Sequence, residues 1–196
     1  MTRDAAELGD TLVLAGALLA GNKVTAFFSH RLLPKRRELP VAAGATAERV
    51  EIQLPKNTDA NAPRDWPAGP YSVSLQIERT GKPTTLTNVL FFALAPRISA
   101  APVVTGGANN PSVTVQFYPE VRDTQRVELF VGGDPFKPTA FVGNVATLAI
   151  PLTGIKPIEG PIPIGLRVDG VDSILVRDPA AKPPQFDPKQ TITLPI

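Results

Sequence analysis

The sequence lacks cysteine altogether and contains one histidine, His30, and one tryptophan, Trp66. Disulfide frameworks, thiol catalysis and Cys/His zinc centres all need residues that are missing here. No apolar run approaches the ~20 residues that span a bilayer. The run from Leu12 to Ala20 follows acidic residues, whereas a signal peptide begins with positive charge. We therefore predict no metal centre, no transmembrane segment and no signal peptide.

Charge of one sign is also scarce. The net charge is +2, with +3 on residues 1–97 and −1 on the remainder. A nucleic-acid-binding domain is strongly basic and clusters its Lys and Arg residues on one face. Neither half has that character, so we predict no nucleic-acid partner.

Proline is abundant, with 22 residues beside 15 glycines, and 43% of the chain is hydrophobic. Together these values indicate a folded chain with a sizeable core and frequent turns. Apolar residues recur at spacing two, which is typical of half-buried strands. The predicted strands are Thr11–Leu14, Val24–Phe28, Val50–Leu54, Tyr71–Ile77, Val89–Leu94, Ser112–Phe117, Arg126–Val131, Ala146–Leu152, Ile162–Val168, Ser173–Arg177 and Thr191–Ile196.

One segment occurs twice at a fixed offset. The stretch from Gly69 to Ile77 aligns with the stretch from Gly160 to Val168, and the apolar positions coincide. Short strands with turn signals between them favour antiparallel sandwiches. We therefore predict an all-β fold of two tandem immunoglobulin-like β-sandwich domains, residues 1–97 and 98–196. A single long sandwich is the alternative.

Two positions carry specific structural expectations. Pro163 lies inside a predicted strand and has no N–H, so the strand is either an edge strand or has this position facing away from the ladder. Trp66 precedes the strongest strand and is predicted to pack over one end of the first sandwich.

Residues capable of chemistry are few and poorly arranged. His30 directly follows Ser29, and neighbours on a strand point to opposite faces, so we expect an exposed loop histidine. Asp59, Asn61 and Asp65 could offer oxygen ligands to calcium, but they lack the spacing of a dedicated loop, and a solvated loop is the preferred interpretation. The segment from Asp169 to Asp172 is predicted to be a tight hairpin turn. We predict no catalytic residue and no cofactor.

One charge cluster stands out. Arg31, Lys35, Arg36 and Arg37 lie between Phe28 and Val41, in a loop that also contains leucine and proline. A run of this kind is either a solvated loop or a protein-docking tip. We take these four residues as the candidate docking loop.

The first half resembles immunoglobulin-like domains of the IPT/TIG type. The resemblance rests on the stretch from Gly9 to Gly16 with Leu19 and Gly21, on the stretch from Trp66 to Val73, and on Thr87-Asn88 ahead of Phe91-Phe92. The second half, from Leu166 to Ser173 and down to Asp187-Pro188 and the final strand, resembles the C-terminal region of cap, or tail-terminator, proteins of phage-tail-like contractile injection systems.

This resemblance implies a non-catalytic, accessory region of a bacterial particle cap that is located in the cytoplasm as part of the assembled particle. The implied partners are sheath, tube or cap subunits, or an envelope component. Members of that family carry an N-terminal domain that forms a ring, and nothing similar precedes Thr11. We therefore expect a fragment or a stand-alone module that oligomerises only through such a domain. The alternative is a generic bacterial immunoglobulin-like surface module or a carbohydrate-binding module.

Overall fold

The computed structural model describes residues 5–41, 44–156, 158–178 and 180–195. The chain divides into two compact units, Met1–Leu94 and Ala95–Ile196. Residues 95–97, which the sequence analysis assigns to the first domain, belong to the second unit. The reason is that Arg97 and Ile98 pair with Tyr118 and Phe117 of that unit.

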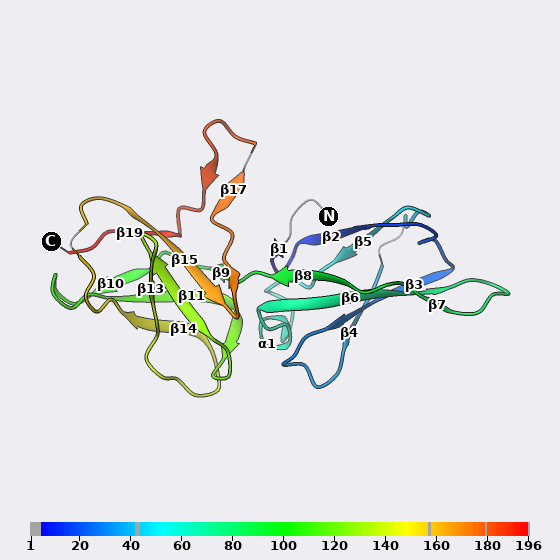
Figure 1. The fold of residues 1–196 in the computed structure, drawn as a ribbon, viewed down its shortest axis with the longest axis horizontal. Coiled ribbons are helices and arrows are strands. Elements are labelled where there is room, and N and C mark those ends of the chain that lie inside the picture. Colours follow the sequence, from blue (N-terminus) through cyan, green and yellow to red (C-terminus); the bar gives the residue numbers. More distant parts are fainter. Residues whose placement is uncertain (1–4, 42–43, 157, 179, 196) are drawn as a thin grey trace. The chain divides into compact units, whose positions relative to one another are not determined.

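The first unit is a sandwich of two sheets (Figure 1). One sheet has the strand order β1-β8-β6-β3-β4, with β7 also paired to β6, and the other is the antiparallel pair β2-β5. A four-residue helix, α1, leads into β6. The bounds are β1 Ala5–Ala6, β2 Thr11–Ala15, β3 Lys23–Ser29, β4 Arg37–Pro40, β5 Arg49–Gln53, α1 Ala62–Asp65, β6 Gly69–Glu78, β7 Thr85–Leu86 and β8 Leu90–Leu94.

The second unit repeats this plan. One sheet has the order β10-β11-β14, with β9 also on β11, and the other has the order β13-β12-β15-β16, with β19 on β15. A hairpin, β17-β18, extends from this sandwich (Figure 1). The bounds are β9 Arg97–Ile98, β10 Val103–Thr105, β11 Ser112–Arg122, β12 Val127–Val131, β13 Asp134–Phe136, β14 Asn144–Pro151, β15 Ile162–Val168, β16 Val171–Asp172, β17 Val176–Asp178, β18 Gln185–Phe186 and β19 Thr191–Ile192.

The fold is all-β and immunoglobulin-like, as predicted. In each unit an early strand pairs with a later one across a long connection, β2 with β5 and β11 with β14. In the opposite sheet β3 pairs with β6, and β12 pairs with β15. This is the Greek-key pairing of an immunoglobulin sandwich.

The duplicated segment forms equivalent strands. β6 lies between β3 and β8, and β15 lies between β12 and the strands β16 and β19. In both strands every second side chain is buried, which places Tyr71, Leu75, Ile164 and Leu166 in the cores. The period-two pattern therefore predicted both core strands.

Three strand predictions need correction. β15 is paired on both sides, so Pro163 is not on an edge strand. It lies one residue before the first β12–β15 pair, Val131 with Ile164, and its carbonyl accepts a 3.0 Å hydrogen bond from the Gly132 N–H. The predicted strand at Ser173–Arg177 is interrupted: Ser173 exchanges hydrogen bonds with Leu166 of β15, just after β16, and β17 begins at Val176. The predicted final strand ends at Ile192, and Ile196 lies outside the described residues.

Candidate functional site

The candidate docking loop connects β3 to β4 in the first unit. Arg37 is the first residue of β4, which corrects the expectation that all four basic residues lie in a loop. Its Nη2 is 3.3 Å from Oδ1 of Asp65 in α1. The guanidinium of Arg36 lies 3.6 Å from the centroid of the Phe27 ring. These contacts hold Arg36 and Arg37 in place, and Arg31, Lys35 and Arg36 are exposed.

His30 is buried, with 6% of its surface exposed, which corrects the prediction of an exposed loop histidine. Its Nδ1 accepts a hydrogen bond of 3.2 Å from the Leu32 N–H. Its ring centroid is 4.6 Å from that of Tyr71. The imidazole therefore packs the start of the docking loop against the core. The preceding residue, Ser29, is exposed.

The three candidate calcium ligands take part in the local structure of their loop and of α1. Oδ2 of Asp59 accepts a 2.8 Å hydrogen bond from the Lys56 N–H, and Asp65 bonds Arg37. Asn61 has a φ of 64° and precedes α1. Within residues 5–41, 44–156, 158–178 and 180–195, no group of three or more His, Cys, Asp or Glu residues could hold a metal ion.

Trp66 packs over the core, as predicted, with 5% of its surface exposed. Its ring centroid lies 5.2 Å from that of Phe28 and 5.8 Å from that of Tyr71. The Tyr71 hydroxyl donates a 3.0 Å hydrogen bond to the Pro67 carbonyl. This back-bond four residues upstream is the tyrosine-corner arrangement of immunoglobulin-like sandwiches. The cluster holds the chain as it turns from α1 into β6.

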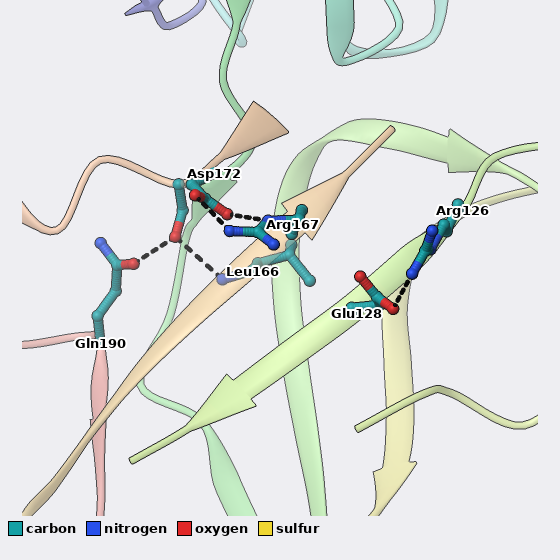
Figure 2. Close-up of polar contacts among 7 residues, drawn as sticks. Arg126, Glu128, Leu166, Arg167, Asp172 and Gln190 are labelled. Atoms are coloured by element: carbon teal, nitrogen blue, oxygen red, sulfur yellow. Dashed lines mark hydrogen bonds and ion pairs between the residues drawn. The ribbon is translucent and has the colours of Figure 1, made fainter. Parts of the chain in front are cut away.

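In the second unit polar side chains bond the middle of β15, as Thr87 bonds Leu75 of β6 in the first unit. Figure 2 shows Gln190 reaching toward β15, where Leu166 and Arg167 lie. Ser173 Oγ accepts a 3.0 Å hydrogen bond from the Leu166 N–H and donates to Gln190 Oε1. Nε2 of Gln190, which is fully buried, donates to the Ile174 carbonyl at 2.8 Å. This chain of bonds satisfies buried polar groups that would otherwise destabilise the core.

The hairpin turn at Asp169 is closed by an ion pair. Asp169 and Gly170 both have positive φ, 49° and 84°, as the predicted tight turn requires. Next to the turn, Arg167 donates to both carboxylate oxygens of Asp172, at 2.6 and 2.9 Å (Figure 2). The hydrogen bond to Asp172 raises the pKa of the Arg167 guanidinium above its ordinary value. This ion pair has a structural role. Because the two groups bond each other, neither is presented as a general acid or base.

A second structural ion pair joins Arg177 to Asp187, which follows β18. Oδ2 of Asp187 accepts a 2.8 Å hydrogen bond from Nε of Arg177, and Oδ1 accepts a 3.0 Å bond from the Lys189 N–H. Burial by itself raises the pKa of the Asp187 carboxyl, but these two donors outweigh burial and hold the pKa below its ordinary value. The carboxylate thus joins the β17-β18 hairpin to the segment that leads into β19.

The sequence analysis missed a cavity of about 350 Å³ in the first unit, lined by Leu14, Leu19, Leu75 and Leu90 among others. Its walls come from two uncharged stretches, residues 11–21 and 85–95, and from residues 73–79 in and after β6. The length of these two uncharged stretches was the feature of the sequence that could have indicated an apolar cavity. Their apolar residues were assigned to the closed core, because spacing alone does not show where a sheet leaves a core uncovered.

The fold and these surfaces define a protein with tandem immunoglobulin-like β-sandwiches. The model of one protein family, described as Domain of unknown function (DUF8756), matches residues 96–193. This match spans half of the chain, and the chain belongs to that family.

Two solved structures show similarity at low sequence identity. The fibronectin(III)-like modules of CbhA from Clostridium thermocellum are 12% identical, with 97% of this chain and 88% of that chain covered and a TM-score of 0.26. The amphioxus IgVJ-C2 molecule is 11% identical, with 87% of this chain and 99% of that chain covered and a TM-score of 0.25. No curated protein matches the chain.

Proposed function

We propose that this chain is a non-catalytic docking module that attaches to a larger assembly, and that the assembly is the cap of a contractile injection particle. The observation that carries the docking proposal is the geometry of the basic loop. Arg36 lies over Phe27 and Arg37 pairs with Asp65, and the side chains of Arg31, Lys35 and Arg36 are exposed to solvent. A loop that is already ordered loses little conformational entropy when it binds.

The chemistry of the loop defines the surface it would bind. Four cations on one tip attract an acidic surface, and such charges mainly increase the association rate and fix orientation. The carboxylates near the loop are those of Glu38 and Asp65, each of which faces one of its arginines. Arg31 and Lys35 are exposed on the same loop, and we propose that the loop as a whole meets carboxylates of a sheath, tube or cap subunit.

Two observations support a non-catalytic role. His30 is buried against Tyr71 with Nδ1 engaged by Leu32, so it is not presented to a substrate. The Ser173 hydroxyl is already engaged within the second unit, by Gln190 and by the Leu166 N–H. The carbohydrate-binding alternative calls for sugar stacking on an exposed aromatic ring, and Trp66, the ring whose exposure would favour it, is only 5% exposed.

The test uses the purified chain and the sheath and tube proteins encoded near its gene. The double variant Arg31→Ser/Lys35→Ser removes two exposed cations and leaves both held arginines in place. We expect binding to weaken by about three- to tenfold at low salt, since each exposed ion pair contributes up to ~1 kcal/mol. Surface plasmon resonance at two salt concentrations measures the change.

The matched control, Lys137→Ser/Lys156→Ser, removes the same charge from exposed positions of the second unit. Equal weakening by both double variants would contradict a specific docking loop. Absence of binding to sheath and tube, or a gene with no such neighbours, would contradict the particle assignment.

A further inference from the structure

The two units differ at one edge of the smaller sheet. In the second unit β11 is paired on both sides, with β14 on one side and with β10 and β9 on the other. In the first unit β2 pairs with β5 alone among the described strands. The N-terminal strand of the first unit, β1, pairs in parallel with β8 of the opposite sheet instead. Among the described residues, therefore, no strand beside β2 corresponds to β10 of the second unit.

The ladder shows which main-chain groups face this open edge. The Leu54 N–H donates to the Asp10 carbonyl, and the Gly16 N–H donates to the Glu48 carbonyl. In an antiparallel pair, hydrogen-bonded and non-hydrogen-bonded positions alternate. Residues 12 and 14 therefore bond β5, and the N–H and C=O groups of Thr11, Val13 and Ala15 point away from it. They form a row that can pair with another strand.

The apolar cavity of about 350 Å³ lies at this edge, and Ala15 is one of its lining residues. Leu14, Leu75 and Leu90 contribute to its walls, and Leu18 lies at its rim with 76% of its surface exposed. Leu18 has a φ of 57°, a conformation that costs a leucine energy. An open strand edge beside an apolar cavity is the arrangement that binds an extended peptide by strand addition.

The charges around the cavity define the chemistry of the occupant. Arg79 is the charged residue among those that line the cavity, and its guanidinium is held by the carbonyls of Leu18 and Ala20. Lys82 is exposed on the same turn. Because β2 runs toward Leu18, an antiparallel partner strand would have its amino end at Arg79 and Lys82. The complementary occupant is apolar with an acidic residue at its amino end.

We propose that the open edge of β2 binds an extended segment of a partner protein as an added antiparallel strand, with alternate apolar side chains in the cavity and an acidic amino end at Arg79. The segment would occupy the place that Val103–Thr105 takes beside β11 in the second unit. This proposal concerns a different surface from the basic loop and does not depend on the particle assignment.

The test uses the full chain and a synthetic peptide with the sequence Asp-Thr-Val-Thr-Leu-Thr-Val-Thr, blocked at both ends. Titration up to about 1 mM detects weak binding. We expect hydrogen exchange at the amides of Thr11, Val13 and Ala15 to slow on binding. The amides of Leu12 and Leu14 already bond β5 and should change little. A peptide with proline in place of its central leucine should not bind, because it breaks the added ladder.

Two exposed positions give a matched pair of variants. Leu18 and Phe91 are both 76% exposed, but Phe91 pairs with Ser72 and lies on the outer face of its sheet. We expect Leu18→Asp to weaken peptide binding at least tenfold and Phe91→Asp to change it less than twofold. Val13→Pro, which removes a single edge-facing N–H, should also weaken binding at least tenfold and provides an independent measurement.

Each of the following results would contradict the proposal in a different way. Absence of peptide binding to the unmodified chain, or equal loss in Leu18→Asp and Phe91→Asp, would overturn the proposal. Self-association that Leu18→Asp abolishes would show that a second copy of the chain occupies the edge, and it would overturn the assignment to a partner peptide. Loss of peptide binding in Arg31→Ser/Lys35→Ser would place the peptide on the basic loop and overturn the proposal as well.

Discussion

In both units a hydroxyl further along the chain accepts a hydrogen bond from the central strand, Thr87 from Leu75 of β6 and Ser173 from Leu166 of β15. The two strands differ near their starts. Tyr71 of β6 packs against Trp66, which packs against Phe28, whereas Ile162 occupies the matching position of β15. The comparison teaches that two copies of one strand plan can share a directional hydrogen bond and still differ in the side chains packed at one end.

The two units also differ in how they treat the edge of the smaller sheet. The second unit pairs β11 with its own segment, residues 97–105. The first unit sends its N-terminal segment to β8 and leaves β2 with one partner among the described strands. A sandwich can thus keep a closed core and still offer a binding edge when one strand changes sheets.

The largest effect is expected from the removal of one ring of the aromatic cluster. Trp66→Ala deletes a buried ring beside Phe28 and Tyr71, and we expect the first unit to lose about 3–5 kcal/mol of unfolding free energy. Urea denaturation followed by circular dichroism measures the loss, and hydrogen exchange should locate it in residues 5–94.

The control for this variant is Phe91→Ala, which removes an aromatic ring that is 76% exposed. An exposed substitution of this kind changes stability by about 0.5 kcal/mol or less. If Trp66→Ala also stayed within that range, the aromatic cluster would not be what holds β6.

An intermediate effect is expected from the ion pair between Asp187 and Arg177 in the second unit. Asp187→Asn removes the charge that faces Arg177 and keeps the shape of the side chain. Because charged hydrogen bonds at a buried site contribute about 1–3 kcal/mol, we expect a loss of that size. Hydrogen exchange should show the loss at residues 174–192, with the exposed Asp134→Asn as the control.

The same carboxylate gives the second unit a dependence on pH. The folded-state pKa of Asp187 lies below its ordinary value of 3.8, so its contribution is complete above that value. The contribution is lost as the pH falls through the lower folded-state pKa. Below about pH 4 the second unit should therefore lose stability in the unmodified chain, and Asp187→Asn should remove this part of the slope. Identical pH profiles would contradict the assignment.

The smallest of these effects concerns the tyrosine corner. Tyr71→Phe keeps the ring in its cluster and removes the hydrogen bond to the Pro67 carbonyl. We expect the first unit to lose about 1 kcal/mol, the usual contribution of one buried hydrogen bond. Hydrogen exchange of the amides at the start of β6 measures it, and a loss spread over both units would refute a local role for this bond.

Much of the fold could be read from local patterns. The alternation from Tyr71 to Ile77 predicted β6 and its buried face, and the second copy from Gly160 to Val168 predicted β15. The Asp169-Gly170 pair predicted the turn between β15 and β16. These succeed because a strand face and a two-residue turn depend on neighbouring residues alone.

The candidate site was less accessible to such patterns. His30 follows an exposed serine, and its burial depends on Tyr71, which lies on another strand. Arg37 belongs to β4 because Phe28 pairs with it. A local pattern of polar residues cannot indicate either partner, because the chain that separates them folds back through the sheet.

By itself, the sequence determined where most of the longer strands of this protein lie, which face of each is apolar, and that one strand unit occurs twice, but it missed short strands such as β4, β10 and β13. Only the tertiary structure decided that β1 pairs with β8, that β2 has one partner among the described strands and lies beside an apolar cavity, and that Arg36 and Arg37 contact Phe27 and Asp65. The physical reason is range: alternation acts between adjacent residues, whereas strand partners and cavities depend on contacts between segments that are far apart in the chain.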